Sequence, residues 1–186
     1  MKTDDMLIDE IKNGQQTSYD ELMQRHQSHV YNIAYNFTRS SDDAMDLSQT
    51  IFLKAYENLG KFRRESQFKT WLMRITYNEG QNWLRKNKKN VLHEDVDASN
   101  DGSFSISPSQ EDEFLASENK ALLIRCLYEL NTKYRLAVIL KYFENYSIKE
   151  ISETLNCSEG VVKNMLFRSL QKMRSEIGSR NNGVSP

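Results

Sequence analysis

The sequence has few of the residues that interrupt helices or cross-link chains. Of its 186 residues, two are proline, seven are glycine and two are cysteine. Alternating runs of Val, Ile and Thr are also missing, so the composition argues against a β-rich fold. Cys126 and Cys157 are far apart and have no CxxC spacing. This argues against a disulfide framework and a structural zinc site, and it is typical of a reducing compartment.

Long apolar runs are absent as well. No stretch of the sequence approaches the roughly 18 apolar residues that a membrane-spanning helix needs. The N-terminus, MKTDDMLIDEIKNG, is acidic and lacks the apolar centre of a secretion signal. We therefore expect a protein of the cytoplasm.

The residues that catalysis requires are sparse too. The three histidines have no carboxylates at metal-ligand spacing, and the chain has neither a glycine-rich phosphate loop nor a nucleophile elbow. We expect no catalytic residue, no metal and no cofactor, and hence no enzyme. A helical nuclease or phosphotransferase stays open as an alternative, which metal-dependent turnover of DNA would support.

Charge is distributed in blocks. Residues 91–118 contain eight Asp and Glu and no Lys or Arg, whereas residues 61–90 contain nine Lys and Arg and two Glu. The net charge of −1 conceals both blocks. Blocks of this kind predict a nucleic-acid partner for the basic residues and a solvated tether for the acidic ones.

Apolar residues recur every three or four positions on both sides of the acidic segment, as in Val30, Ile33 and Phe37. A structureless loop of this length inside one compact domain would be unusual. We therefore predict an all-α protein of two small helical domains joined by a flexible acidic linker, the C-terminal domain being a helix-turn-helix. The predicted boundaries are domain 1–90, linker 91–118, domain 119–178 and disordered tail 179–186.

Residues 145–174, NYSIKEISETLNCSEGVVKNMLFRSLQKMR, have the pattern of a helix-turn-helix. Ser147 and Glu150 fit a capping box that opens the first helix. Asn156 tolerates the left-handed backbone of a tight turn, and Ser158 can cap the second helix. A single helix over 121–143 would support them. The period of the second helix predicts that it buries Val162, Leu166, Leu170 and Met173.

The opposite face of that second helix is polar and basic. In a major groove, Asn164 and Gln171 could read adenine, Lys163 and Arg168 could contact guanine or phosphate, and Phe167 could contact a thymine methyl. An ordinary helical hairpin with a solvated face has the same pattern.

The basic block 61–90 also contains Phe62, Phe68 and Trp71. Unpaired bases stack on aromatic rings with about 1–3 kcal/mol each, and neighbouring cations hold the phosphates. The block therefore fits the capture of flipped bases. Aromatic residues at helical spacing fit a hydrophobic core equally well, and we place Leu72 and Ile75 in the core.

Residues 42–78, DDAMDLSQTIFLKAYENLGKFRRESQFKTWLMRITYN, resemble the second domain of the extracytoplasmic-function (ECF) sigma factors of bacterial RNA polymerase. Residues 19–35 resemble the first conserved helix of that family, and residues 127–174 resemble its fourth domain. The matching patterns are D-A-x-D-L-x-Q-x-x-F, present as Asp43, Ala44, Asp46, Leu47, Gln49 and Phe52, and F-x-x-W-L-x-x-I, present as Phe68, Trp71, Leu72 and Ile75.

The resemblance implies a bacterial alternative sigma factor that binds core RNA polymerase, at the β′ clamp and the β flap, and directs promoter-specific initiation. It implies promoter DNA and an anti-sigma factor as further partners, and association with the nucleoid when active. The implied core-binding residues are Asp43, Asp46, Leu47, Gln49, Phe52, Leu53 and Tyr56.

The resemblance also divides the DNA contacts between two promoter elements. Binding and melting of the −10 element is implied for Lys61, Phe62, Arg63, Arg64, Phe68, Lys69, Trp71, Arg74, Asn78, Gln81, Asn82 and Arg85. Binding of the −35 element is implied for Ser158, Lys163, Asn164, Phe167, Arg168 and Gln171.

Within residues 77–83, three residues depart from the family's pattern. Glu79, Gly80 and Asn82 stand where apolar residues and an Asp are usual, and a glycine in mid-helix costs about 1 kcal/mol relative to alanine. Which residues of 77–83 contact DNA therefore stays open. So does a second function, a two-domain helix-turn-helix regulator that binds DNA without polymerase, although it leaves the 43–56 pattern unused.

Overall fold

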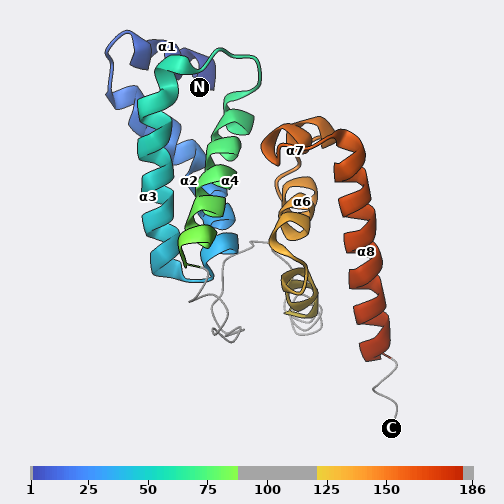
Figure 1. The fold of residues 1–186 in the computed structure, drawn as a ribbon. Coiled ribbons are helices and arrows are strands. Elements are labelled where there is room, and N and C mark those ends of the chain that lie inside the picture. Colours follow the sequence, from blue (N-terminus) through green and yellow to red (C-terminus); the bar gives the residue numbers. More distant parts are fainter. Residues whose placement is uncertain (1, 88–120, 182–186) are drawn as a thin grey trace, which may run out of the picture. The chain divides into compact units, whose positions relative to one another are not determined.

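The computed structural model describes residues 2–87 and 121–181, and every regular element in these ranges is a helix (Figure 1). The chain divides into two compact units, one formed by α1 to α4 and the other containing α6 and α8. This confirms the predicted all-α class with two helical domains. The predicted linker 91–118 lies outside the described residues, as do both of its boundaries.

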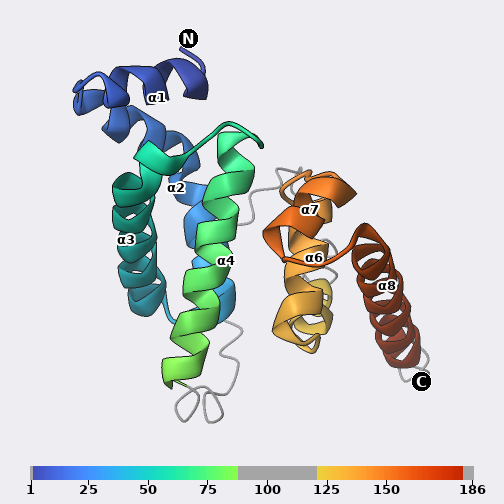
Figure 2. The ribbon, with the colours of Figure 1, turned by 45° about the horizontal axis from the view of Figure 1, so that its top comes forward.

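The N-terminal unit is built around a central helix. Helix α2 packs against α1, α3 and α4 (Figure 2). The bounds are α1 Asp4–Lys12, α2 Thr17–Thr38, α3 Ser41–Asn58, the 3-10 helix η1 Leu59–Lys61 and α4 Phe68–Asn87.

Local polar contacts explain where these helices begin and end. The Thr3 hydroxyl accepts from the Met6 N–H at 3.3 Å and caps α1, and the Ser40 hydroxyl does the same for α3 through the Asp43 N–H at 3.3 Å. Arg39 ends α2 with a left-handed φ of 61°. These three helix ends thus follow from short-range chemistry.

Gly80 of α4 lies directly against Phe37 of α2. A Cβ atom at this position would stand 2.2 Å from the ring of Phe37, far inside van der Waals contact. Phe37 is itself fully buried. The low helix propensity of Gly80 is therefore offset by a close helix–helix approach, which explains one of the three departures from the family pattern.

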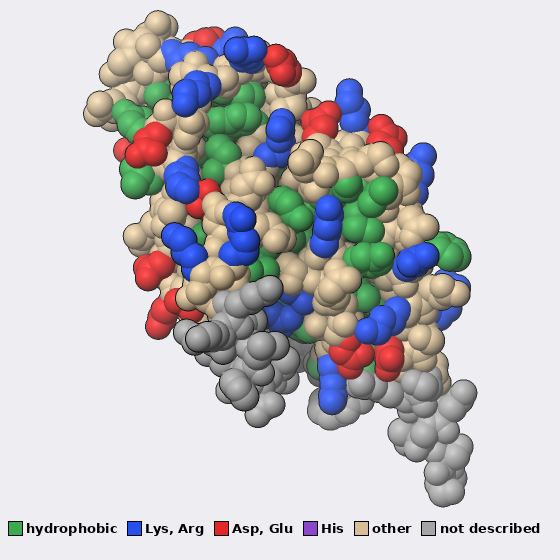
Figure 3. Space-filling view, viewed as in Figure 1, with side chains coloured by type: hydrophobic (Ala, Val, Ile, Leu, Met, Phe, Trp, Pro, Cys, Tyr) green, Lys and Arg blue, Asp and Glu red, His purple; other side chains and the backbone are tan. Residues whose placement is uncertain are grey.

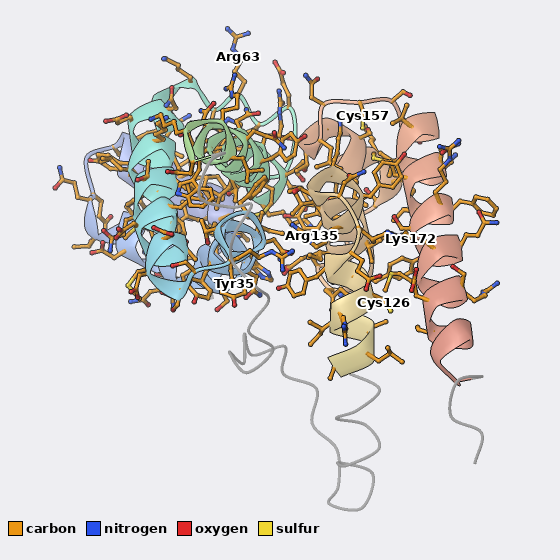
Figure 4. All side chains as sticks on the ribbon, turned by 60° about the horizontal axis from the view of Figure 1, so that its bottom comes forward. Tyr35, Arg63, Cys126, Arg135, Cys157 and Lys172 are labelled. Carbon is orange, nitrogen blue, oxygen red and sulfur yellow. The ribbon has the colours of Figure 1, made fainter. Side chains whose placement is uncertain are left out.

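The C-terminal unit differs from the prediction at its start. The single helix expected over 121–143 is two: a helical segment at 121–128, and α6 at Thr132–Tyr142. Asn131 causes the break, because its side chain accepts from the Tyr134 N–H at 3.1 Å and caps α6. The buried Arg135 side chain donates to the carbonyl of Leu130 at 3.1 Å and stabilises the turn (Figure 4).

Helix α8 (Glu159–Asn181) completes this unit and packs against α6, and α7 (Ile148–Thr154) precedes α8 in the chain. Lys172 of α8 donates to the carbonyl of Glu129 at 3.0 Å, which joins α8 to the turn before α6. Because α8 continues to Asn181, the first residues of the tail expected at 179–186 are helical, and residues 182–186 lie outside the described ranges.

Among the described residues, no helix combines the length and the apolar character that crossing a membrane requires.

Candidate polymerase and nucleic-acid interfaces

One face of α3 keeps apolar side chains in solvent. Met45, Leu53 and Tyr56 are all exposed, Leu53 to 60%. The exposed Asp46 and Gln49 lie among them, because positions 45, 49, 53 and 56 form one stripe at helical spacing. We call these five residues the α3 stripe. An apolar surface rimmed by polar groups is typical of a protein-binding site.

The α3 stripe contains most, but not all, of the predicted core-binding residues. Asp43 is exposed near the start of the helix, and Phe52 is half-buried. Leu47 contradicts the prediction, because it points inward and belongs to the buried core. Met45 was missed, although its spacing of four residues from Gln49 could have indicated it.

Tyr19 supports the stripe from α2. Its hydroxyl donates to the Phe52 carbonyl, and its ring packs edge-on against Tyr56 with 4.8 Å between centroids. Burial raises the pKa of Tyr19 above its usual value, so the hydroxyl stays protonated and keeps this hydrogen bond. Tyr56 is thereby oriented before any partner binds.

The three aromatic residues proposed for base capture pack against one another. Ring centroids are 5.8 Å apart for Phe62 and Phe68, 5.2 Å for Phe62 and Trp71, and 5.6 Å for Phe68 and Trp71. Phe62 is 4% exposed and Phe68 is 5% exposed. Neither can offer a ring face to a base, so their assignment to DNA is wrong. Trp71 is half-buried and is the member of this cluster that can.

His26 continues the cluster toward α1. Its ring lies 5.3 Å from that of Phe68, and its Nε2 lies 2.8 Å from a carboxylate oxygen of Asp4. His26 is buried, in agreement with its place in the apolar stripe of α2. In residues 2–87 and 121–181 no group of three or more His, Cys, Asp or Glu side chains could hold a metal ion.

The basic residues before α4 and in its first turn have different environments. Lys61 and Arg63 are exposed, and Arg63 points away from the unit (Figure 4). Lys69 is half-buried. Arg64 turns back to form ion pairs with Asp5 and Asp9 of α1. Adjacent arginines of this loop thus face opposite directions.

The predicted −10 residues of α4 share one face of the helix. Arg74, Asn78 and Arg85 are exposed, and Gln81 and Asn82 are half-buried. Their spacings of three and four residues place them on the same side as Trp71. Figure 3 shows Lys and Arg side chains gathered on the side of this unit where α4 lies.

Glu79 does not lie among apolar side chains. Its carboxylate pairs with Lys54 of α3 at 2.6 Å and accepts from the Asn82 amide at 3.2 Å. Arg85 in turn donates to the Asn82 carbonyl oxygen. The unusual Glu79 and Asn82 therefore belong to one polar chain from α3 to the exposed face of α4, which accounts for the other two departures within residues 77–83.

The predicted capping and turn pattern of the helix-turn-helix is confirmed. The Ser147 N–H donates to the Glu150 carboxylate at 2.9 Å, and the Glu150 N–H donates to the Ser147 hydroxyl at 3.2 Å. Asn156 has a left-handed φ of 48°. The Ser158 hydroxyl accepts from the Val161 N–H at 3.4 Å and caps α8.

All predicted −35 residues are exposed, Phe167 to 67%. The buried stripe of α8 differs from the prediction, because Leu170 is 42% exposed while Met165 and Ser169 are buried. Each step of four residues turns about 40° beyond a full helical turn. Two such steps from Val162 carry Leu170 out of the core.

Comparison with known proteins identifies the family. The model of Sigma-70 region 2 matches residues 22–90, and that of Sigma-70, region 4 matches residues 120–173. Together they span most of the chain. The chain belongs to the sigma-70 family and is an ECF-type sigma factor, as the resemblance predicted. Sigma factors are regulators of transcription rather than enzymes.

Individual relatives extend over almost the whole chain. The ECF RNA polymerase sigma-E factor of Haemophilus influenzae is 28% identical over 181 residues, which cover 94% of this chain and 95% of that protein. The sigma-E factor of Escherichia coli K12 is also 28% identical, with 94% of each chain covered.

Two solved structures share the fold. CnrH, in complex with the cytosolic domain of CnrY, superposes with a TM-score of 0.67 and 21% identity over 94% of this chain and 96% of that one. RpoE of Bartonella quintana, in complex with the anti-sigma factor NepR, gives a TM-score of 0.65 and 22% identity over 86% of this chain and 96% of that one.

Proposed function

We propose that this protein is a bacterial alternative sigma factor that binds core RNA polymerase, opens promoter DNA at the −10 element and reads the −35 element. The observation that carries the proposal is that one chain, which matches both sigma-70 regions, has both the exposed α3 stripe and an exposed polar face on α8. We propose no catalytic role. The protein would act in the cytoplasm, at the nucleoid when active.

Polymerase binding is assigned to the α3 stripe. Its apolar side chains offer buried area to a partner, and Asp46 and Gln49 offer hydrogen bonds that fix orientation. Asp43 extends the surface toward the start of α3, and the half-buried Phe52 borders the stripe beside Leu53. The β′ clamp is the expected partner of this surface, and the β flap is the expected partner of the C-terminal unit.

Opening of the −10 element is assigned to Trp71 and the polar face of α4. An exposed base can stack on the free part of the Trp71 ring. Lys61, Arg63, Lys69 and Arg74 supply cations for the phosphates of the opened strand. Asn78, Gln81, Asn82 and Arg85 continue this surface along α4.

Reading of the −35 element is assigned to α8. Asn164 and Gln171 present amides, Lys163 and Arg168 present cations, and Phe167 presents an apolar ring on the exposed face. Ser158 lies at the N-terminus of this helix, where a hydroxyl and backbone N–H groups suit a phosphate.

An anti-sigma factor is the further partner that we propose. RpoE of Bartonella quintana is bound to such a factor, and CnrH to the cytosolic domain of CnrY. In this chain, the α3 stripe and Phe167 are apolar surfaces that an inhibitor could cover. Covering either surface would prevent polymerase or DNA from binding there.

Run-off transcription tests the proposal. Purified protein and core polymerase are incubated with a library of bacterial genomic fragments, and defined start sites are expected. Leu53→Asp should abolish assembly with core, because it places a charge in the α3 stripe. The matched control, Thr50→Asp, adds the same charge to an exposed position of α3 outside the stripe.

The outcomes separate the two functions. If no defined start is ever transcribed, the proposal fails. Sequence-specific DNA binding by the protein alone, with no assembly on core polymerase, would instead identify a regulator that acts independently.

A further inference from the structure

Helix α1 contacts the loop at residues 62–67, which leads from η1 into α4. Both lie at the same end of the N-terminal unit (Figures 1 and 2). The Lys12 ammonium donates to the Phe62 carbonyl at 3.1 Å. Arg64 donates to the backbone carbonyl of Asp5 at 3.3 Å and forms an ion pair with the carboxylate of Asp9. The loop is thus held to α1 at two points.

Contacts outside the loop fix α1 to the rest of the unit. Leu7 and Ile8 are fully buried. Asp4 pairs with Arg25 of α2 at 3.1 Å and with His26 at 2.8 Å. Because these contacts do not involve the loop, α1 is a fixed support to which the loop is attached.

The conformation of the loop needs such a support. Arg64 has a φ of 60°, in the left-handed region that arginine seldom adopts. Its ion pairs hold the side chain on α1, and the adjacent Arg63 is left exposed and directed away from the unit (Figure 4). The Lys12 contact holds Phe62, whose ring lies against Trp71.

We propose that α1 positions the strand-opening loop, with Lys12, Asp9 and Arg64 as positioning residues. In this arrangement Arg63 and Trp71 meet the opened strand, whereas Arg64, expected from the family resemblance to contact DNA, acts through α1. The matched region 2 begins at residue 22 and does not include α1. The inference rests on the proposed function, so its experiment has one arm that requires no DNA.

The DNA arm measures binding of holoenzyme to a fork-junction oligonucleotide with a single-stranded −10 element, at several salt concentrations. Arg64→Ala and Asp9→Asn should each weaken binding by about two- to fivefold, the range for an exposed ion pair. The double variant should be no worse than Arg64→Ala alone, because that substitution already removes the contact with Asp9. The salt dependence should be unchanged, because no phosphate contact is lost.

Two controls calibrate this arm. Arg63→Ala should lower the salt slope by about one, as loss of a phosphate contact does. Asp20→Asn removes a carboxylate from an exposed position of α2 and should leave binding unchanged. A charge exchange, Asp9→Arg with Arg64→Asp, should restore binding above that of either single exchange.

The other arm uses the free protein. With Trp83→Phe, Trp71 is the remaining tryptophan, since the chain has two. Asp9→Asn and Lys12→Met should each shift Trp71 emission and increase its quenching by acrylamide, whereas Asp20→Asn should not. Circular dichroism verifies that each variant remains helical.

Two results would overturn the proposal. One is that neither α1 substitution changes the emission or the quenching of Trp71. The other is a reduced salt slope for Arg64→Ala together with unchanged or stronger binding for Asp9→Asn. The latter would place Arg64 directly on phosphate. If wild-type holoenzyme does not bind the oligonucleotide, the proposed function fails, and the fluorescence arm still decides whether α1 supports the loop.

Discussion

The two units use aromatic side chains of similar sequence context in opposite ways. Phe62 and Phe68 lie among arginines and lysines, yet both are buried, whereas Phe167 of α8 lies next to Arg168 and is 67% exposed. In the N-terminal unit, His26 of α2 and Trp71 of α4 supply ring partners for Phe68 and Phe62. In α8, Met165, Leu166 and Ser169 already occupy the buried side. An aromatic residue in a basic segment can therefore contact a ligand only where the core does not bury its ring.

Their cations differ as well. In the N-terminal unit Arg64 and Lys54 are committed to ion pairs, and Arg85 donates to Asn82. On α8, Lys163 and Arg168 are exposed on the face that carries Phe167. We therefore expect contacts of the C-terminal unit with DNA to depend on charge more directly, and those of the N-terminal unit to depend on geometry.

The largest expected effect tests the comparison between the buried Phe68 and the exposed Phe167. Phe68→Ala should lower the free energy of unfolding by about 3–5 kcal/mol, because it leaves a cavity among Phe62, Trp71 and His26. Phe167→Ala should change it by less than about 0.5 kcal/mol and should weaken −35 binding instead. Urea unfolding and footprinting of the −35 element measure the two effects. Equal stability losses would mean that both rings are core.

Trp71→Ala should make open-complex formation less favourable by about 1–3 kcal/mol of free energy, the value of one base stack. Permanganate reactivity of the −10 element measures opening, and closed-complex binding should change less. Trp83→Ala serves as a control for loss of an indole from the same helix. A loss of closed-complex binding as large as the loss of opening would contradict base capture.

Gly80→Ala should destabilise the N-terminal unit by about 1–3 kcal/mol, although alanine is the better helix former, because α4 must move away from Phe37. Thermal unfolding measures the loss. Phe37→Leu in the same chain should recover part of the effect of Gly80→Ala. A stabilised Gly80→Ala variant would show that propensity outweighs the close approach.

Lys163→Ala with Arg168→Ala should weaken promoter binding by roughly tenfold and lower the salt slope by about two, if both cations contact phosphate. Filter binding at a series of salt concentrations measures both quantities. An unchanged upstream footprint would contradict the proposed binding of α8 in the major groove.

The smallest expected effect concerns the polar chain from α3 to α4. Glu79→Gln removes the charge that pairs with Lys54 and should cost at most about 1 kcal/mol of stability, since Lys54 is partly exposed. Glu79→Gln and Asn82→Ala should each weaken binding to the upstream part of the −10 element, and the double variant should be no weaker than Asn82→Ala alone, because Glu79 orients Asn82. Independent, additive losses would separate the two residues.

The amino-acid sequence by itself determined the features that short-range chemistry controls. The helical class, the capping box at Ser147 and Glu150, the turn at Asn156 and the cap at Ser158 all follow from residues within a few positions of one another. The exposed side of α8 also follows, since every predicted −35 residue is on it. The family pattern selected a helix, α3, that has an exposed apolar face, and the error at Leu47 came from treating a pattern residue as a surface residue.

Only the tertiary structure decided which aromatic and charged residues are free. The burial of Phe62 and Phe68 depends on His26 and Trp71, the need for Gly80 depends on Phe37, and the direction of Arg64 depends on Asp9. Except for the neighbouring rings of Phe62, Phe68 and Trp71, each pair joins segments that are distant in the sequence. Burial and ion pairing are properties of such long-range contacts, so no local pattern could have revealed them.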